Sequence, residues 1–97
     1  MNHQQPGTPS GDVTAAAGAT TVCAGPGILL ALTVQAPAGN VASVTAADGG
    51  TVIWRAAAVA SSNNHVTFDA GLIFNTSLII TTTGTNGISN ASFIKGG

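Results

Sequence analysis

One stretch of this sequence places two chemically competent side chains at a useful spacing. His65, Thr67 and Asp69 alternate with apolar residues, so on a strand all three would lie on one face. A histidine and a carboxylate on the same face could act together in general acid–base catalysis, or they could be metal ligands. A third ligand or a nucleophile is not apparent in the sequence. We therefore interpret this stretch as an exposed polar face beside a loop.

The other candidates for chemistry have simpler interpretations. Cys23 is the only cysteine and has no His or Lys near it in the sequence, so we expect it to be a buried packing residue. Ser61 and Ser62 have no base beside them that could activate a hydroxyl. We expect no catalytic residue, no metal and no cofactor, and hence no enzyme and no small-molecule substrate.

Charged residues make up only 5% of the chain, with two basic and three acidic side chains and a net charge of −1. Nucleic acid and anionic membrane surfaces both require several Lys or Arg on one face, so neither is an expected partner. A free domain normally remains soluble through many interspersed charges. The mean hydropathy of +0.41 therefore predicts that other protein subunits cover much of the surface, including further copies of this chain.

No targeting or membrane segment is evident in the sequence. The longest apolar run, residues 28–34, is far shorter than the roughly 20 residues that span a bilayer. Residues 1–10 lack the basic and apolar regions of a signal peptide. These observations favour synthesis in the cytoplasm, followed by incorporation into an assembly.

Composition divides the chain into two parts. Residues 1–20 consist mainly of Gln, Pro, Gly, Ser, Thr and Ala, with Val13 as the only large apolar side chain besides Met1. Such a segment buries too little surface to offset the entropy lost on ordering. We predict a flexible N-terminal arm over residues 1–20 and a single β-sandwich domain over residues 21–97.

From residue 21 onward, short runs of Val, Ile, Thr and Leu are broken about every ten residues by turn residues. This texture predicts an all-β fold, namely a small antiparallel β-sandwich or a jelly-roll-like barrel. The expected strands span residues 21–24, 28–36, 41–47, 51–59, 66–70, 77–83 and 88–94, and residues 72–74 are expected to form a buried plug or a short strand. The pair Asn86-Gly87 is typical of a tight hairpin, so we expect the last strand to fold back directly on residues 77–83.

Strict alternation assigns faces within these strands. In residues 28–36 it places Leu29 on the face opposite Leu32 and Val34, and in residues 77–83 it places Ile79 opposite Leu78 and Ile80. Trp54 and Arg55 are neighbours on one strand, so one should fill the core while the other points outward. Trp and Arg are enriched where interfaces are energetically strongest. The predicted interface residues are therefore Trp54, Arg55, Leu29 and Ile79.

Several turn and packing patterns resemble those of a known group of proteins. These are residues 22–29 (VCAGPGIL), 48–53 (DGGTVI), 68–74 (FDAGLIF) and the closing strand 88–97. The pattern is similar to that of small β-sandwich structural proteins from tailed bacteriophages, and in particular to capsid decoration (cement) proteins. The resemblance implies a virion protein on the capsid surface, in homo-oligomers that are often trimers. It also implies binding between subunits of the major capsid protein, with an arm that ties neighbours together and stabilises the shell.

Two alternatives share this composition. A neck, tail or head-fibre subunit of a virion would differ only in location. A carbohydrate-binding module on a receptor-recognising fibre would need exposed aromatic side chains for stacking, and Trp54 is the only aromatic residue with a polar group.

Overall fold

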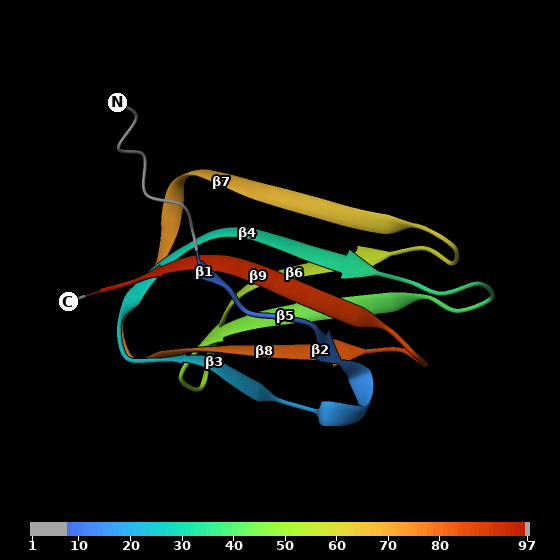
Figure 1. The fold of residues 1–97 in the computed structure, drawn as a ribbon, viewed down its shortest axis with the longest axis horizontal. Helices are drawn as coiled ribbons and strands as arrows, with labels where there is room; N and C mark the ends of the chain where they lie inside the picture. Colours follow the sequence, from blue (N-terminus) through green and yellow to red (C-terminus); the bar gives the residue numbers. More distant parts are fainter. Residues whose placement is uncertain (1–7, 97) are drawn as a thin grey trace.

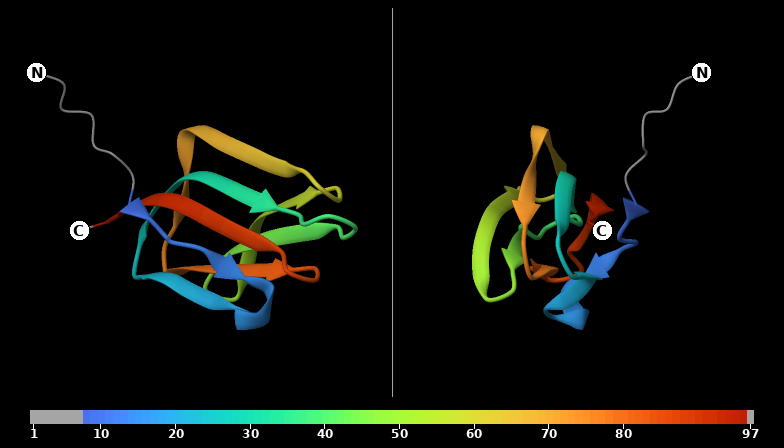
Figure 2. Two further views of the ribbon diagram at one scale, coloured as in Figure 1. Left: turned by 45° about the vertical axis from the view of Figure 1, so that its right-hand side comes forward. Right: turned by 90° about the vertical axis from the view of Figure 1, so that its left-hand side faces the viewer.

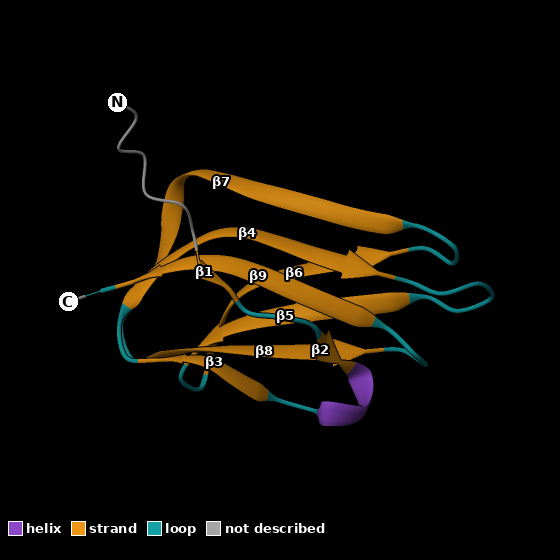
Figure 3. Ribbon diagram, viewed as in Figure 1, coloured by secondary structure: helices purple, strands orange, loops and turns teal. Residues whose placement is uncertain are grey.

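The protein folds into two antiparallel β-sheets packed face to face, as a computed structural model shows for residues 8–96 (Figure 1). About two thirds of the described chain is strand, and its one helix is the short 3₁₀ helix η1 (Figure 3). The predicted all-β sandwich is confirmed. The elements are β1 (Thr8–Pro9), β2 (Val13–Thr14), η1 (Ala15–Ala17), β3 (Thr20–Ala24), β4 (Gly27–Gln35), β5 (Ala42–Asp48), β6 (Thr51–Ala58), β7 (Asn63–Phe74), β8 (Ser77–Thr83) and β9 (Ile88–Lys95).

The strand order is that of a jelly roll. Sheet A contains β1 and β2 beside β9, followed by β4 and β7, and sheet B has the order β3-β8-β5-β6. Along the chain, β2 pairs with β9, β3 with β8, β4 with β7, and β5 with β6, which makes one long antiparallel ribbon. The ribbon is rolled so that β9 also pairs with β4, and β8 with β5. The topology is thus that of a jelly roll, and its two sheets pack as a β-sandwich.

The core lies between the sheets and is built from alternate residues of each strand. Its largest fully buried side chains include Phe74, Leu32, Leu78 and Ile80. Cys23 is 5% exposed within this core, which fits its interpretation as a packing residue. In β8 the predicted alternation holds along the strand, with Leu78, Ile80 and Thr82 buried between more exposed neighbours.

The alternation predicted for β4 is wrong at its start. The register of β4 shifts between Leu29 and Ala31 against both β7 and β9, so an irregularity at Leu30 interrupts the period of two. Leu29 consequently shares the inner face with Leu32 and Val34, and its side chain has 0% exposure. It belongs to the core and not to the outer surface.

Residues 8–20 lie on the sandwich, so the predicted boundary of the arm is too far along the chain. Val13 is 3% exposed and belongs to the core cluster. The backbone N–H of Ser10 donates to the Ala91 carbonyl at 2.8 Å, and the Ala91 N–H donates back to Ser10 Oγ at 2.8 Å. The N-terminal strands thus run along the free edge of β9 (Figure 2). Residues 1–7 of the predicted arm lie outside the described residues.

The last strand does not fold back on β8. The turn after β8 does contain a left-handed residue, Asn86 with φ of 59°, and the Gly87 N–H donates to the Gly84 carbonyl at 3.0 Å. However, both edges of β8 are already occupied by β3 and β5. The turn therefore carries the chain across to the other sheet, where β9 pairs with β4.

Candidate interaction surfaces

The outer face of sheet A is a regular array of side chains from β9, β4 and β7. Their neighbours in each strand, such as Phe93, Leu32 and Phe74, are buried, so the intervening side chains point away from the core. The pairing of the strands sets these side chains in rows across the sheet. The rows are Ile94–Ile28–Ile73, Ser92–Ala31–Thr67, Asn90–Thr33–His65 and Ile88–Gln35–Asn63.

This outer face changes character along its length. At one end the isoleucine row is apolar, and Ile73 is 64% exposed. The middle rows carry small and hydrogen-bonding groups, and Thr33 Oγ1 is hydrogen-bonded to His65 Nδ1 at 2.6 Å. None of the four rows contains an Asp, Glu, Lys or Arg.

The outer face of sheet B has a different chemistry. It is rich in hydroxyl groups and contains a hydrogen bond between Ser43 Oγ and Thr83 Oγ1. Arg55 pairs with Thr45 in the middle of this face and is exposed. The rows are Thr21–Ile79–Ala47–Val52, Thr81–Thr45–Arg55 and Thr83–Ser43–Ala57.

The structure separates the predicted interface residues. Arg55 is exposed and Ile79 half-buried, and both lie on the outer face of sheet B. Leu29 lies in the core, as described above. Trp54 occupies the inner side of β6 and is 39% exposed. Trp54 and Arg55 therefore do point in opposite directions, as expected for neighbours on one strand.

Trp54 closes one side of the sandwich. Its ring meets Phe68 of β7 in an edge-to-face contact, with centroids 5.0 Å apart and an interplanar angle of 84°. The nearby Asn64 side chain donates to the Ala57 carbonyl at 3.0 Å and so links β7 to β6. Trp54 thus joins the open edges of the two sheets and does not form a flat, free aromatic platform.

The polar stretch on β7 extends beyond the part of the strand that pairs with β4. His65 and Thr67 lie opposite Thr33 and Ala31, whereas the next residue in register with β4 is Leu72, opposite Leu29. Asp69 belongs to the intervening bulge, but exposed and half-buried residues still alternate from His65 to Asp69, so Asp69 lies on the same side of β7 as Thr67. The alternation breaks at Ala70, which is exposed although it follows Asp69 at the position of an inward-pointing residue. Within residues 8–96, no cluster of three His, Cys, Asp or Glu side chains could hold a metal ion.

Asp48 has a structural role that the sequence analysis missed. Its carboxylate accepts hydrogen bonds from the backbone N–H groups of Asn75 at 2.9 Å, Thr76 at 2.7 Å and Ser77 at 3.4 Å. The bonds from Asn75 and then Thr76 lower the pKa of Asp48, against a smaller opposing effect of desolvation. An Asp immediately before Gly-Gly was the available signal, because aspartate often accepts backbone N–H groups in turns. The sequence alone does not show that these groups belong to a distant turn.

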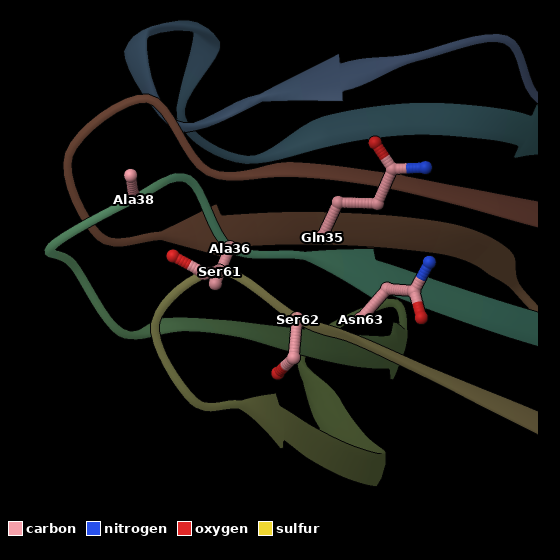
Figure 4. Close-up of a pocket in the computed structure, with 6 residues that line it drawn as sticks. All are labelled: Gln35, Ala36, Ala38, Ser61, Ser62 and Asn63. Atoms are coloured by element: carbon pink, nitrogen blue, oxygen red, sulfur yellow. The ribbon is translucent and has the colours of Figure 1, made fainter.

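A surface hollow with a volume of about 540 Å³ lies between the β4–β5 and β6–β7 loops. Its side chains diverge: the Gln35 carboxamide and the Ser62 hydroxyl point to opposite sides (Figure 4). Ser62 Oγ donates to the Val59 carbonyl at 2.7 Å within its own loop. The lining consists of Gln35, Ala36, Ala38, Ser61, Ser62 and Asn63, none of which is an ionisable group. This hollow therefore provides no arrangement for acid, base or nucleophilic chemistry.

Comparison with known proteins gives no match to any family model, curated protein or solved structure. Among the described residues, no helix has the length and apolar character needed to cross a membrane. The surfaces described above are therefore the basis for assigning a function.

Proposed function

We propose that this protein is a structural subunit of a bacteriophage virion, which decorates the capsid and stabilises it by binding between major capsid protein subunits. The observation that supports this proposal best is the shortage of charge on two broad sheet faces. In the described residues, the four rows on sheet A contain no Asp, Glu, Lys or Arg, and the rows on sheet B contain one, Arg55. Asp69 lies just beyond the Thr67 row, at the edge of sheet A.

This surface suits a protein that works inside an assembly. Small free domains normally keep both signs of charge interspersed over their surface, because charge prevents association and precipitation. Here Ile73 is 64% exposed on one flank and Val41 and Val59 are 61% and 70% exposed on loops. Packing against other subunits would remove these side chains from water.

The compact sandwich gives such a subunit its rigidity. The N-terminal strands cover the β9 edge, and Trp54 with Phe68 joins the opposite edges. The proposed binding is thus between preformed surfaces, which limits the conformational entropy lost on association. No catalytic step, metal or cofactor is part of this proposal. The virion class itself comes from the resemblance of the turn patterns, and the flat neutral faces agree with it.

The location in the particle can be tested directly. Antibodies raised against the folded protein would be applied to purified virions and visualised by electron microscopy. Labelling over the whole capsid surface is expected for a decoration protein. Labelling confined to the neck, tail or fibres would support the alternative role as a subunit of those structures, and absence of the chain from purified particles by mass spectrometry would contradict both.

Shell binding provides a second readout. The full-length protein would be added to shells assembled from the major capsid protein alone, and the shells would be sedimented. Saturable co-sedimentation, together with a higher temperature of shell disruption, is expected. Failure to bind at micromolar concentrations would overturn the decoration role.

A further inference from the structure

We propose that the outer face of sheet A is the surface through which copies of this chain pack against one another. The proposed occupant is a second copy of the chain, and the inference rests on the proposed function as a subunit of an assembly. Four properties of the rows on β9, β4 and β7 support it.

The first property is the position of the charged residues. In a symmetric homo-oligomer every group near the rotation axis lies close to its own copies, so a charge there faces like charges. The rows on sheet A avoid this repulsion because they carry no Asp, Glu, Lys or Arg. Within residues 8–96 the charges lie outside these rows: Asp12 between β1 and β2, Asp48 and Arg55 on sheet B, Asp69 in the β7 bulge at the edge of the sheet A face, and Lys95 at the end of β9.

The second property is the type of polar group in the middle rows. Amides and hydroxyls both donate and accept hydrogen bonds, so each can pair with an identical group from another copy. Asn90, Thr33 and Thr67 provide such groups on neighbouring strands, and Gln35 and Asn63 provide them in the last row. A strongly charged partner would find no opposite charge in these rows. The same rows of a second copy are also uncharged and can pair their amides and hydroxyls with these.

The third property is the apolar end row. Ile28 and Ile94 are half-buried, while Ile73 is 64% exposed at the edge of the sheet. Ile28 lies between Ile94 and Ile73 in this row and also borders Gly71 of the β7 bulge. Contact with a second copy would bury them at the flank of an interface whose centre is polar, and apolar burial of this kind favours association.

The fourth property is size. Three strands spaced about 4.8 Å apart, with four rows separated by two residues each, cover about 400 Å² of sheet in projection. The accessible surface of a sheet with protruding side chains exceeds this projection. The face therefore has the size of a small protein interface, below the roughly 800 Å² per partner of a standard one.

Sheet B satisfies these conditions less well. Arg55 lies in its middle row, beside Thr45, and would face its own copy across a symmetry axis. In a decoration protein that face remains open for a different partner, such as the shell. The two sheets thus have separate proposed roles, self-association on sheet A and shell contact on sheet B.

The test compares single charges placed on the two faces. Thr67→Lys adds a charge to a middle row of the sheet A face, on β7, and Thr83→Lys adds the same charge to the outer face of sheet B; both threonines are exposed. Asn90→Asp changes an amide to a carboxylate on the sheet A face, and Asn86→Asp makes the same change in the β8–β9 turn. Molar mass would be measured for each full-length protein by light scattering after size exclusion, with circular dichroism to verify folding.

The wild-type chain is expected to form a discrete oligomer. Thr67→Lys and Asn90→Asp should raise its dissociation constant at least about tenfold, while Thr83→Lys and Asn86→Asp leave the mass unchanged. Dissociation by Thr83→Lys but not by Thr67→Lys would overturn the inference, because the copies would then associate through sheet B. The protein would still be an oligomer, so the proposed function would stand. A wild-type monomer at all concentrations would also overturn it, and shell co-sedimentation of that monomer would then decide the proposed function separately.

Discussion

At the scale of single residues, Asp48 connects two parts of the chain that are far apart in sequence. Its carboxylate, at the end of β5, holds the backbone of the turn between β7 and β8. Ionised carboxylates form stronger hydrogen bonds to backbone N–H groups than neutral acceptors do. The charge on Asp48 therefore serves the fold, and its location away from the sheet A face leaves that face neutral.

The stability of the protein should depend on pH through Asp48. Because the folded state lowers the pKa of this carboxyl, its stabilising contribution is complete above the unfolded-state pKa of about 3.9 and is lost as the pH falls through the folded-state pKa. Asp48→Asn should therefore melt below wild type at pH 7, and the difference should shrink once the pH falls below about 4. Thermal unfolding followed by circular dichroism from pH 7 to pH 2 measures this. Asp12→Asn, at an exposed position between β1 and β2, is the control, and an undiminished difference for Asp48→Asn at pH 2 would contradict the assignment.

Removing two buried hydroxyls, one at a time, should have different effects on the free energy of unfolding. Thr82 Oγ1 donates to the Val13 carbonyl at 2.8 Å, whereas Ser89 Oγ is buried without a hydrogen-bond partner. Thr82→Val should cost about 1 kcal/mol, because it also deprives a buried carbonyl of a donor. Ser89→Ala should be neutral or should stabilise the protein by about 1 kcal/mol, because it removes a polar group that is buried without compensation. Urea unfolding gives both values, and a destabilised Ser89→Ala would show that this hydroxyl has a partner.

At the scale of the elements, the N-terminal strands are part of the sandwich. They cover the outer edge of β9, and Val13 fills a place in the core. An unpaired strand edge is a site for unwanted pairing with other chains. Residues 8–14 thus protect the edge of the very sheet that we propose as the self-association face.

Val13 provides a matched test of this role. Val13→Ala should lower the free energy of unfolding by about 2 kcal/mol, because Val13 is 3% exposed and its truncation leaves a cavity. Val59→Ala removes the same atoms at a position that is 70% exposed, so it should change stability by less than about 0.5 kcal/mol. Chemical denaturation compares the two. Equal effects would mean that the N-terminal segment does not contribute to the core.

The bend in β7 depends on a glycine. Gly71 has a φ of +77°, and a Cβ added to it would overlap Cγ2 of Ile28. Gly71→Ala should therefore cost about 2 kcal/mol or more, from the left-handed backbone and the overlap together. Gly50→Ala is the control, since a Cβ there meets nothing within 4 Å. Differential scanning calorimetry of both variants tests this, and a Gly71→Ala melting temperature equal to that of Gly50→Ala would contradict it.

The sequence predicted the strands well because each is a short apolar run between turn residues. The strand Ser77–Thr83 matches the prediction at both ends, and five others match within one residue. The predicted segments 66–70 and 72–74 instead belong to one strand, β7, and β1 and β2 were not predicted. The faces could be predicted only where no bulge intervenes, so Ile79 lies where expected and Leu29 does not. The partner of β9 could not be predicted from Asn86-Gly87, because that choice depends on which edges of β8 other strands already occupy.

The interface could be predicted from the sequence only in outline. The shortage of charge indicated covered surfaces, but the rows of sheet A exist only once β9, β4 and β7 are in register. Ile28, Ile73 and Ile94 come from three separate segments, and no local pattern joins them. Trp54 was a reasonable candidate by residue type, yet its contact with Phe68 depends on the two sheet edges meeting.

At the scale of the whole molecule, neutral faces predict an unusual response to salt. An interface without ion pairs has no charge attraction for ions to screen. The dissociation constant of the oligomer should therefore change by less than about threefold between about 0.05 M and about 1 M sodium chloride, while sulfate should strengthen association through apolar burial. Analytical ultracentrifugation across this series measures the effect. Steep weakening with sodium chloride would instead indicate that Arg55, Lys95 or the aspartates mediate the contact.

The position of β9 has a consequence for how the protein is made. This strand is synthesised after all the other described strands, yet it lies between β2 and β4, which precede it by more than 50 residues (Figure 1). Until β9 leaves the ribosome, the edge of β4 that it will occupy is open and sheet A is incomplete. Sheet A is therefore completed only once β9 has emerged, after all its other strands have been made. A chain on which β9 has not yet emerged thus lacks the face that we propose for self-association.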